Sequence, residues 1–337
     1  MQSIQIKNLG ENQLIDSFRR KYYYLRLSIT DVCNFRCTYC LPNGYRPNSL
    51  EQSFLTRNEI HRLVQAFAAM GTEKIRLTGG EPTLRKDFLA IVETIRQIEE
   101  IKNIALTTNG YKMSEQVVAW KQAGVTSINV SVDSLDPRMF QCITGKNKFY
   151  DVMRGIDRAF ECGYQKIKVN SVLMKNLNDR EFNRFLDWIK NKPIQIRFIE
   201  LMQTREMEAF FHRHHLSGNL LMDKLCRSGW ELQTKMRSDG PAKVFKHPDF
   251  AGEVGLIMPY EKNFCADCNR LRVSAKGKLH LCLFGEEGID LRDLLQSDEQ
   301  LSILQAKLFS ALQGKREHHF LHRGDSGVRT NLSTIGG

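Results

Sequence analysis

Residues 33–40 read CNFRCTYC, so that Cys33, Cys37 and Cys40 have the spacing C-x-x-x-C-x-x-C. The motif follows a β-rich run, Tyr24–Thr30, and we therefore expect it on a loop at the end of a first strand. Thiolates this close together can hold a compact iron–sulfur cube, and three of them leave one of its four irons open. A structural zinc ion normally takes four protein ligands. The spacing therefore favours an open iron–sulfur cluster.

Between residue 24 and about residue 200, β-rich runs alternate with amphipathic helical patterns. The expected strands are Tyr24–Thr30, Lys74–Thr78, Ile104–Thr108, Ser127–Asp133, Lys166–Leu173 and Ile194–Glu200. The clearest expected helices are Asp87–Ile101, Ser114–Ala123, Asp151–Cys162 and Asp179–Asn191. A further helix should begin after Thr56, which forms a capping box with Glu59. Six βα units in series predict a parallel sheet with right-handed crossovers.

Polar residues follow nearly every expected strand, which favours a barrel over a doubly wound sheet. Besides the cysteine loop they are Gly79-Gly80-Glu81-Pro82, Asn109-Gly110 and Asp133-Ser134. In barrels, functional residues gather at the carboxyl ends of several strands. Because six units are fewer than eight, we expect an α/β fold with an incomplete (β/α)6 TIM-like barrel. After the turn cluster Asp239-Gly240-Pro241 the pattern becomes mainly β, so we expect a core at residues 17–240 and a C-terminal domain at 241–337.

The composition is that of an ordinary globular protein. The chain has 337 residues, with 42% hydrophobic and 26% charged residues, and 49 Lys+Arg against 38 Asp+Glu give a formal charge of +11. No apolar run approaches the roughly 18 residues of a membrane span, and no apolar signal-peptide core follows Met1. We therefore expect a cytoplasmic protein whose nine cysteines are not paired in disulfides. Three cysteines outside any cluster, Cys142, Cys162 and Cys226, are expected to be buried.

A second group of three cysteines lies near the C-terminus. Cys265 and Cys268 form a CxxC at an expected turn, and Cys282 lies on the returning strand of a hairpin around Lys276-Gly277. The three thiols could hold a second open cluster. Alternatively, His280 could share a strand face with Cys282 and complete a closed zinc site. The spacing alone leaves both possibilities open.

The first triad, with Tyr39 before its last cysteine and GGEP at residues 79–82, resembles the signature of the radical S-adenosylmethionine (radical SAM) superfamily. The resemblance implies that Cys33, Cys37 and Cys40 hold a 4Fe–4S cluster that binds S-adenosylmethionine. It implies release of methionine and a 5′-deoxyadenosyl radical, so that the protein itself binds, orients and excludes water. By the same resemblance, Gly79 and Gly80 approach the ligand closely and Glu81 faces its ammonium group.

Within the superfamily the chain is similar to the GTP 3′,8-cyclase family over about residues 20–337. The matching stretches are 25–31, 74–82, 106–110, 129–133, 196–200, 265–282 and the terminal Gly336-Gly337. The resemblance implies a lyase that converts GTP to (8S)-3′,8-cyclo-7,8-dihydroguanosine 5′-triphosphate in molybdenum cofactor biosynthesis. Hydrogen removal from the ribose C3′ would precede bond formation to C8 of guanine. The second triad would hold another 4Fe–4S cluster, which contacts guanine.

The resemblance also implies a role for individual residues. The SAM site would include Tyr39, Gly79, Gly80, Glu81, Ser131 and Met202. The GTP site would include Arg26, Lys74, Arg76, Thr107, Lys168, Arg197, Arg270 and Arg272. Besides the first triad, the catalytic group would include Arg26, Arg270, Arg272, Gly336 and Gly337.

Four of these cations support an anionic ligand without reference to any family. Arg26, Arg76, Lys168 and Arg197 alternate with apolar residues on expected strands of a parallel sheet, whose strands are normally near-continuously hydrophobic. Buried cations are costly unless an anion accompanies them. GTP carries about four negative charges, and Arg binds phosphate well because it can form two parallel hydrogen bonds. The pattern therefore favours a polyanionic ligand inside the barrel.

The sequence is also compatible with two other functions. One is a radical SAM enzyme with an auxiliary cluster that modifies peptides. The other is a zinc-stapled nucleic-acid-binding protein that uses the positive charge, which would need its basic residues on one outer face. The favoured reading implies an external electron donor, cyclic pyranopterin monophosphate synthase as the enzyme that accepts the product, and a homodimer, with no nucleic-acid or membrane partner.

Overall fold

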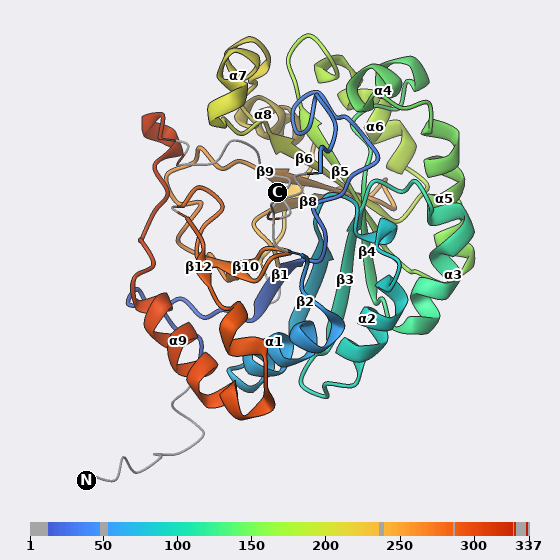
Figure 1. Cartoon of the computed structure of the whole chain (residues 1–337). Coiled ribbons are helices and arrows are strands. Elements are labelled where there is room, and N and C mark those ends of the chain that lie inside the picture. Colours follow the sequence, from blue (N-terminus) through green and yellow to red (C-terminus); the bar gives the residue numbers. More distant parts are fainter. Residues whose placement is uncertain are drawn as a thin grey trace, which may run out of the picture.

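The structure is a computed structural model that describes residues 13–47, 53–235, 239–285, 287–325, 327 and 335. Six parallel strands form the centre of one mixed sheet, and the helices that connect them lie outside it (Figure 1). These strands are β1 (Tyr24–Ser28), β2 (Lys74–Thr78), β3 (Asn103–Thr108), β4 (Ser127–Ser131), β5 (Ile167–Leu173) and β6 (Ile194–Glu200). The expected incomplete α/β barrel is confirmed.

The α-helices are α1 (Arg57–Ala69), α2 (Phe88–Arg96), α3 (Met113–Ala123), α4 (Pro137–Thr144), α5 (Phe149–Glu161), α6 (Phe182–Ile189), α7 (Glu208–His214), α8 (Asn219–Arg227) and α9 (Leu301–Gln313). The expected capping box starts α1: the Glu59 amide donates to Thr56 Oγ1 at 3.2 Å, and the Thr56 amide donates to Glu59 Oε2 at 2.7 Å. Glu59 also accepts a bond from Arg292 at 2.8 Å, which ties this helix to the C-terminal part of the chain. Within the described segments, no helix is long and apolar enough to cross a membrane.

Each central strand has one apolar face and one polar face. Leu25, Leu27, Ile75 and Leu77 are fully buried in the hydrophobic core. Their neighbours at alternate positions face the inside of the curved sheet, because successive side chains of a strand point to opposite sides. The burial of the outer face stabilises the barrel and leaves the inner face free to carry polar groups.

The C-terminal part of the chain adds strands to both edges of the central sheet, in the order β12-β11-β10-β1-β2-β3-β4-β5-β6-β9-β8-β7. These strands are β7 (Glu231–Leu232), β8 (Lys243–Lys246), β9 (Glu253–Ile257), β10 (Arg270–Val273), β11 (Lys278–His280) and β12 (Ile289–Asp290). Strands β9 and β10 pair in parallel with β6 and β1, and the strands beyond them pair antiparallel.

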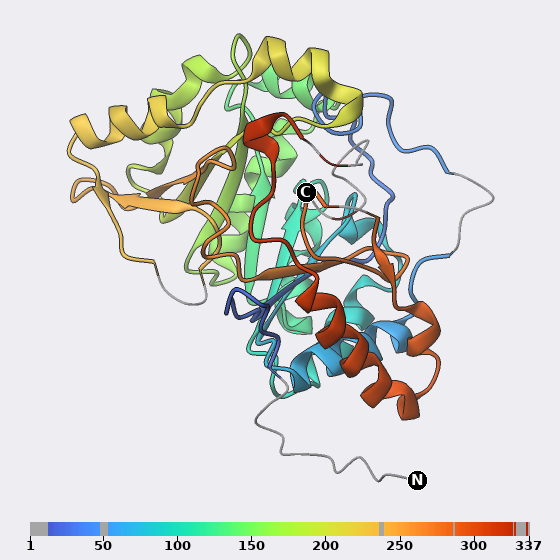
Figure 2. The same cartoon turned by 90° about the vertical axis from the view of Figure 1, so that its left-hand side faces the viewer.

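This arrangement joins the two parts of the chain into one structure. Leu304, Leu308 and Leu312 of α9 belong to the same core cluster as α1, and the two helices pack together at the lower end of the barrel (Figure 2). The boundary expected near residue 240 falls inside the β7–β8 hairpin. The inner face of the barrel is therefore walled by residues from both parts.

Candidate active site

The inner face of the sheet surrounds a cavity of about 290 Å³. Its wall contains both cysteine triads and seven Lys or Arg side chains, which come from strands throughout the barrel. The cations are Arg26, Lys74, Arg76, Lys168, Arg197, Arg270 and Arg272. Gly79, Gly80, Thr107, Ser131, Tyr39 and Met202 line the same cavity. The site residues expected from distant parts of the sequence are thus brought together.

The first triad lies on the loop after β1, and the loop after β2 supports it. The amides of Gly80 and Glu81 donate to the carbonyl oxygens of Thr30 and Val32 at 2.9 and 2.7 Å. A Cβ atom on Gly79 would lie 2.1 Å from the Thr30 oxygen, and one on Gly80 would lie 2.3 Å from the Val32 oxygen. Both positions therefore require glycine because the two loops touch through their backbones.

A buried carboxylate next to the triad holds Tyr39. The Tyr39 hydroxyl donates to Asp133 Oδ2 at 2.8 Å, and the Val172 amide donates to Asp133 Oδ1 at 2.8 Å. Burial raises the pKa of Asp133 to about 6, against the effect of these two bonds. Burial also raises the pKa of Cys33 to about 11 and that of Cys40 to about 12, so the thiols are protonated at neutral pH until iron binds.

Glu81 differs from the expectation that it faces the ligand. Its side chain is fully buried and is not part of the cavity wall. Its oxygens accept bonds from the Thr83 hydroxyl at 2.6 Å, the Thr108 hydroxyl at 2.8 Å and the Asn109 amide at 2.6 Å. Because its acceptors face these groups, Glu81 is a residue that positions the loops after β2 and β3.

The second triad lies in the C-terminal part, with Cys265 and Cys268 before β10 and Cys282 after β11. Cys265, Cys268 and Cys282 line the cavity, whereas His280 does not. The His280 ring instead packs on Gly288, where an added Cβ would lie 2.2 Å from it. Strand β11 ends at His280, so Cys282 lies beyond the strand. The alternation of side chains along a strand therefore does not place His280 and Cys282 on the same face. The proposed fourth zinc ligand is therefore absent from the described wall.

The charges around the second triad differ from those around the first. Burial alone would raise the pKa of Cys268, but Lys315 and Arg270 lower it below its usual value. Arg20 Nη1 donates hydrogen bonds to the carbonyl oxygens of Cys265 at 3.1 Å and Glu317 at 2.6 Å. Arg20 Nε forms a salt bridge with Asp16 Oδ2 at 2.6 Å. These cations favour thiolate at Cys268 and fix the loop that carries the CxxC.

Both triads fit an iron–sulfur cube better than a single metal ion. All nine cysteines are free of disulfides. Across the described ranges, no three His, Cys, Asp or Glu side chains are grouped tightly enough to hold one ion. Two cavity-facing groups of three cysteines have the donor set of open clusters.

The cations of the wall are buried (Arg76, Arg197 and Arg272) or partly buried (Arg26, Lys74, Lys168 and Arg270), and they repel one another. Burial and then Arg197, Lys74 and Arg76 lower the pKa of Lys168 to about 7. Burial and then Arg76 lower the pKa of Arg197 to about 10, against the opposing effects of Tyr24, Asp239 and Glu253. Among the described residues, the carboxylates that line the cavity are Asp133 and Glu200. The wall is therefore strongly positive and suited to a polyanion.

Hydrogen bonds hold two of these arginines in place. Arg197 Nε donates to Gln195 Oε1 at 2.7 Å, and Gln195 Nε2 donates to Glu253 Oε2 at 2.6 Å. Arg76 donates to the Tyr24 hydroxyl and, at 3.2 Å, to the Thr107 hydroxyl. The guanidinium groups are thus oriented by side chains of the protein itself.

The end of the chain approaches the same wall. The Ile335 side chain is buried, and Arg272 Nη1 donates to the Ile335 carbonyl oxygen at 3.3 Å. Gly336 and Gly337, for which the sequence suggests a catalytic role, lie outside the described residues. The contact places residue 335 next to a cation of the proposed GTP site.

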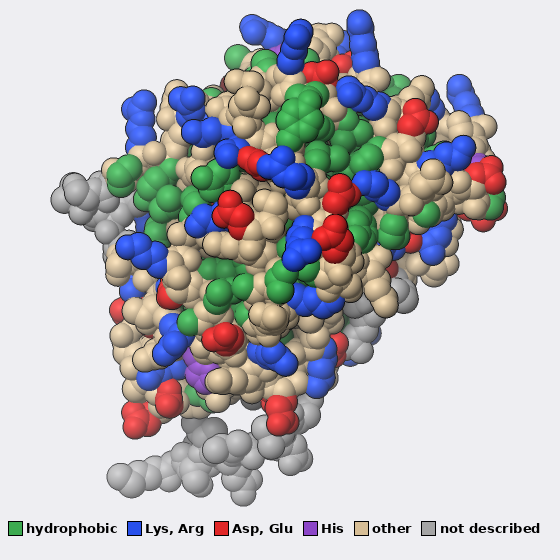
Figure 3. Space-filling view, turned by 90° about the vertical axis from the view of Figure 1, so that its right-hand side faces the viewer, with side chains coloured by type: hydrophobic (Ala, Val, Ile, Leu, Met, Phe, Trp, Pro, Cys, Tyr) green, Lys and Arg blue, Asp and Glu red, His purple; other side chains and the backbone are tan. Residues whose placement is uncertain are grey.

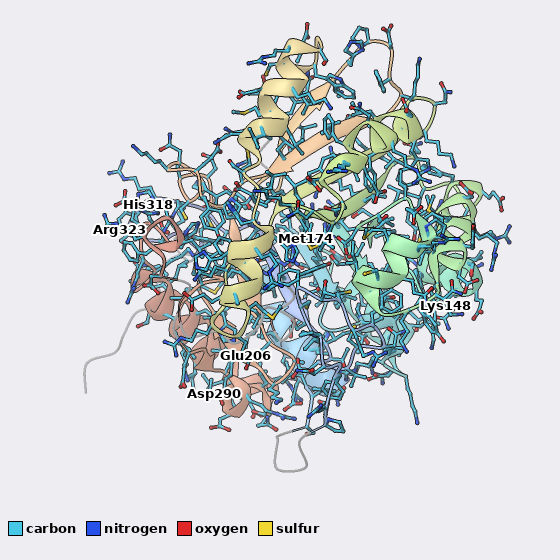
Figure 4. The ribbon with its side chains drawn as sticks, turned by 90° about the horizontal axis from the view of Figure 1, so that it is seen from above. Lys148, Met174, Glu206, Asp290, His318 and Arg323 are labelled. Carbon is cyan, nitrogen blue, oxygen red and sulfur yellow. The ribbon has the colours of Figure 1, made fainter. Side chains whose placement is uncertain are left out.

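The sequence interpretation missed several residues of the wall. Tyr24 lines the cavity two positions before Arg26, so the strand period of two could have identified it. Asp133, which the sequence placed after a strand without a site role, also lines the cavity. His319 also lines the cavity, between the rings of Phe264 and Phe284, at centroid distances of 5.7 and 5.2 Å. Seen from above, its neighbour His318 lies at the outer edge of the molecule with Arg323 (Figure 4). No sequence signal separates these two adjacent histidines.

The side-chain oxygens of Asn129 and Asn170 are buried on the cavity wall. Within the described structure, neither oxygen has a hydrogen-bond partner. Buried polar groups normally have partners. The two asparagines on β4 and β5 therefore fit a polar ligand in the cavity.

The three cysteines outside the triads were expected to be buried, and this was wrong. Cys142 and Cys226 are exposed, and Cys162 is partly exposed. They lie on or at the end of helices on the outside of the barrel, where one small side chain adds little to the core. On the face made by the outer helices, Lys and Arg are interspersed with Asp and Glu (Figure 3), and this face does not present the one-sided basic surface that nucleic-acid binding would need.

Two family models match the two parts of the chain that line the cavity. Residues 27–189 match the model of the Radical SAM superfamily, and residues 194–321 match that of Molybdenum Cofactor Synthesis C. The crystal structure of Streptococcus suis SuiB bound to S-adenosylmethionine shares the fold, with a TM-score of 0.58 and 14% identity. That match covers 88% of this chain and 68% of the other.

Curated relatives match the whole chain. The GTP 3′,8-cyclases of Mannheimia succiniciproducens and Haemophilus influenzae are each 73% identical to it over 337 residues, and that of Pasteurella multocida is 74% identical. Each alignment covers 100% of both chains. With two cysteine triads and a cationic wall in one cavity, the chain belongs to the GTP 3′,8-cyclase family of radical SAM enzymes, which act in molybdenum cofactor biosynthesis.

Proposed function

We propose that this radical SAM lyase holds one 4Fe–4S cluster on Cys33, Cys37 and Cys40 and a second on Cys265, Cys268 and Cys282. The observation that supports this assignment is that both triads line one cavity together with seven cations. When bound, the first cluster supplies the electron that cleaves S-adenosylmethionine to methionine and a 5′-deoxyadenosyl radical. A shared cavity allows that radical to reach a GTP molecule bound between the two triads.

The residues after β1, β2 and β4 are proposed to bind S-adenosylmethionine. Backbone groups of Gly79 and Gly80 border the first triad, and Tyr39, Ser131 and Met202 complete the wall around it. Glu81 acts through the loops that it holds. Asp133 fixes the Tyr39 ring beside the cluster loop, because it accepts the hydrogen bond of the phenol.

The strand cations are proposed to bind the triphosphate of GTP. Arg26, Lys74, Arg76, Lys168 and Arg197 would bind phosphate oxygens, with Thr107 beside them, while Arg270 and Arg272 lie next to the second triad. The guanine would then approach the second cluster and place the ribose toward the first. In such an orientation the cations on β1, β2, β5 and β6 would hold the triphosphate, and the ribose would lie between the two triads.

Replacement of Arg197 tests the triphosphate site. The variant Arg197→Ala is expected to weaken GTP binding about ten- to hundred-fold, because a charge-assisted hydrogen bond contributes roughly 1.5–3 kcal/mol. Anaerobic equilibrium binding of GTP to the reconstituted enzyme measures this change. The control is Arg154→Ala on the outer surface of α5, where the side chain is 67% exposed.

The binding measurement has a clear negative outcome. Unchanged GTP affinity in Arg197→Ala, with Arg154→Ala also unchanged, would place the triphosphate elsewhere. Cleavage of S-adenosylmethionine without GTP serves as the fold check for both variants, since that reaction needs the first triad and not the triphosphate site.

The chain end is proposed to take part in turnover. The Ile335 carbonyl oxygen contacts Arg272, and Gly336 and Gly337 follow Ile335 directly in the sequence. Deletion of both glycines should leave the Kd for GTP unchanged and suppress formation of the cyclised product. A wild-type rate of product formation in single-turnover assays would refute this role.

The remaining partners follow from the chemistry. An external one-electron donor must reduce the first cluster, and the product is proposed to pass to cyclic pyranopterin monophosphate synthase. A cytoplasmic location is part of the proposal, since cluster thiols must remain reduced, and a homodimer is proposed from the family resemblance alone. We also propose that the core at 17–240 and the extension at 241–337 are functional units, because each contains one triad.

A further inference from the structure

Tyr24 is a buried phenol at the centre of the cationic wall. It begins β1, is 5% exposed and lines the cavity. In the sheet it lies opposite Lys74 of β2 on one side and Arg270 of β10 on the other. Arg26 follows it by two positions on its own strand and faces the same side.

The contacts of Tyr24 join the cations of three strands. Its hydroxyl oxygen accepts a bond from Arg76 Nε. Lys74 Nζ lies 5.0 Å from the centre of its ring, and the Arg76 guanidinium carbon lies 5.7 Å from it. Tyr24 also forms a side-chain hydrogen bond with Arg26. The position of this one ring therefore affects three side chains that are proposed to bind phosphate.

The surrounding charges favour the ionised phenol. Burial alone would raise the pKa of Tyr24, but Arg76, Arg26 and Lys74 lower it to about 6. The other charged groups of this wall are Arg270 and Arg272 from β10, Lys168 from β5, Arg197 from β6, and the more distant carboxylates Asp133, Glu200 and Asp239. The groups closest to the phenol are thus positive.

We propose that Tyr24 is the resident anion of the triphosphate site: its phenolate balances Arg26, Lys74 and Arg76 before GTP binds, and it takes up a proton when the triphosphate replaces it. The step forms one O–H bond, with the proton supplied by solvent, and involves no redox change. Tyr24 is therefore a positioning residue, whose charge holds the arginines ready and is withdrawn on binding. This inference rests on the proposed location of the triphosphate.

The proposal fixes the direction of a pH dependence. When the triphosphate neutralises the cations, the effect of burial remains and the pKa of Tyr24 rises. Between the free and bound values, GTP binding takes up a proton, so the affinity decreases as the pH increases. For one linked proton the change is up to about tenfold per pH unit. The Kd for GTP should be measured from pH 7.5 to 8.5, because this range lies above the pKa of about 6 for Tyr24 without GTP.

Calorimetry counts this proton directly. GTP is titrated anaerobically into the reconstituted enzyme at pH 8.0, in two buffers of different ionisation enthalpy. The variant Tyr24→Phe keeps the ring that contacts Lys74 and removes the ionisable hydroxyl. It should bind GTP with about one proton fewer than the wild type and with a flatter pH dependence of Kd.

Lys168 needs a matched control, since its pKa is also lowered, to about 7, and it could take up a proton. The variant Lys168→Arg keeps the charge but does not titrate in this range. It should still take up about one proton on GTP binding. If uptake is lost in Lys168→Arg, or is the same in Tyr24→Phe as in the wild type, the proposal is overturned.

Two further measurements separate the possible failures. If Tyr24→Phe binds no GTP, the proton count of Lys168→Arg decides alone: about one proton supports Tyr24, and none overturns it. If Arg197→Ala leaves GTP affinity unchanged, the triphosphate site itself is wrong. If Arg197→Ala weakens binding while Tyr24→Phe keeps the full uptake, only the role of Tyr24 fails.

Discussion

Replacing Cys37 with serine is expected to abolish formation of 5′-deoxyadenosine from S-adenosylmethionine. A serine hydroxyl does not replace a thiolate as a ligand of an iron–sulfur cluster, and the first triad has no spare cysteine on its loop. The partly buried Cys37 thiol lines the cavity, and desolvation raises its pKa well above the usual value, so only metal binding would keep it ionised. Loss of one of the three ligands would therefore prevent the first triad from holding its cluster, and with it the site at which S-adenosylmethionine would bind.

The measurement combines product analysis with iron content. Iron should fall from about eight to about four atoms per chain after anaerobic reconstitution, since the second triad is intact. The matched control is Cys142→Ser, which changes an exposed cysteine on α4 and should retain both iron and activity. Cleavage of S-adenosylmethionine by Cys37→Ser at the wild-type rate would exclude the first triad as the reductive site.

Replacing Cys282 with serine is expected to separate the two half-reactions. Cys282 lies with Cys265 and Cys268 in the part of the wall that also contains Arg270 and Arg272. The first triad and its supporting loop, after β1 and β2, are unchanged in this variant. Cys282→Ser should therefore still cleave S-adenosylmethionine but form no cyclised GTP, because the guanine loses its binding partner.

Chromatography of both products from one reaction checks this separation. Iron should again fall to about four atoms per chain, now with the first cluster retained. The control is Cys226→Ser on α8, another exposed cysteine outside the cavity. Cyclised product at the wild-type rate in Cys282→Ser, or equal loss of both products, would contradict the assignment of the second triad to GTP.

Most of the central strands could be predicted, because each reads as a short alternating run between turn residues. Lys74–Thr78 and Ile194–Glu200 have the expected bounds, and the capping box of Thr56 and Glu59 is confirmed. The helix expected at Asp87–Ile101 ends at Arg96. The helix Pro137–Thr144 was missed, although the sequence carries its start: Asp136 caps it and Pro137 follows at the first helical position.

The sequence predicted which residues form the candidate site more fully than it predicted where their side chains point. Both triads and the cations were named from the sequence, and all of them line the cavity. The roles of His280, Glu81 and His319 could not be read from the pattern. Each depends on which way a side chain points at a strand end or in a loop, where neither the strand period nor the helix period applies.

What the sequence determined by itself was local: the spacing of each triad, the glycines at 79 and 80, the helix caps and the alternation that marks each strand. The tertiary structure alone decided that β10 lies beside β1 and β9 beside β6, so that one cavity contains both triads. It likewise placed Tyr24 opposite Lys74 and Arg270, residues 50 and 246 positions away. The physical reason is that local patterns follow from the backbone and its nearest neighbours. The pairing of distant strands, in contrast, is decided by the packing of the whole core, which no short stretch of sequence contains.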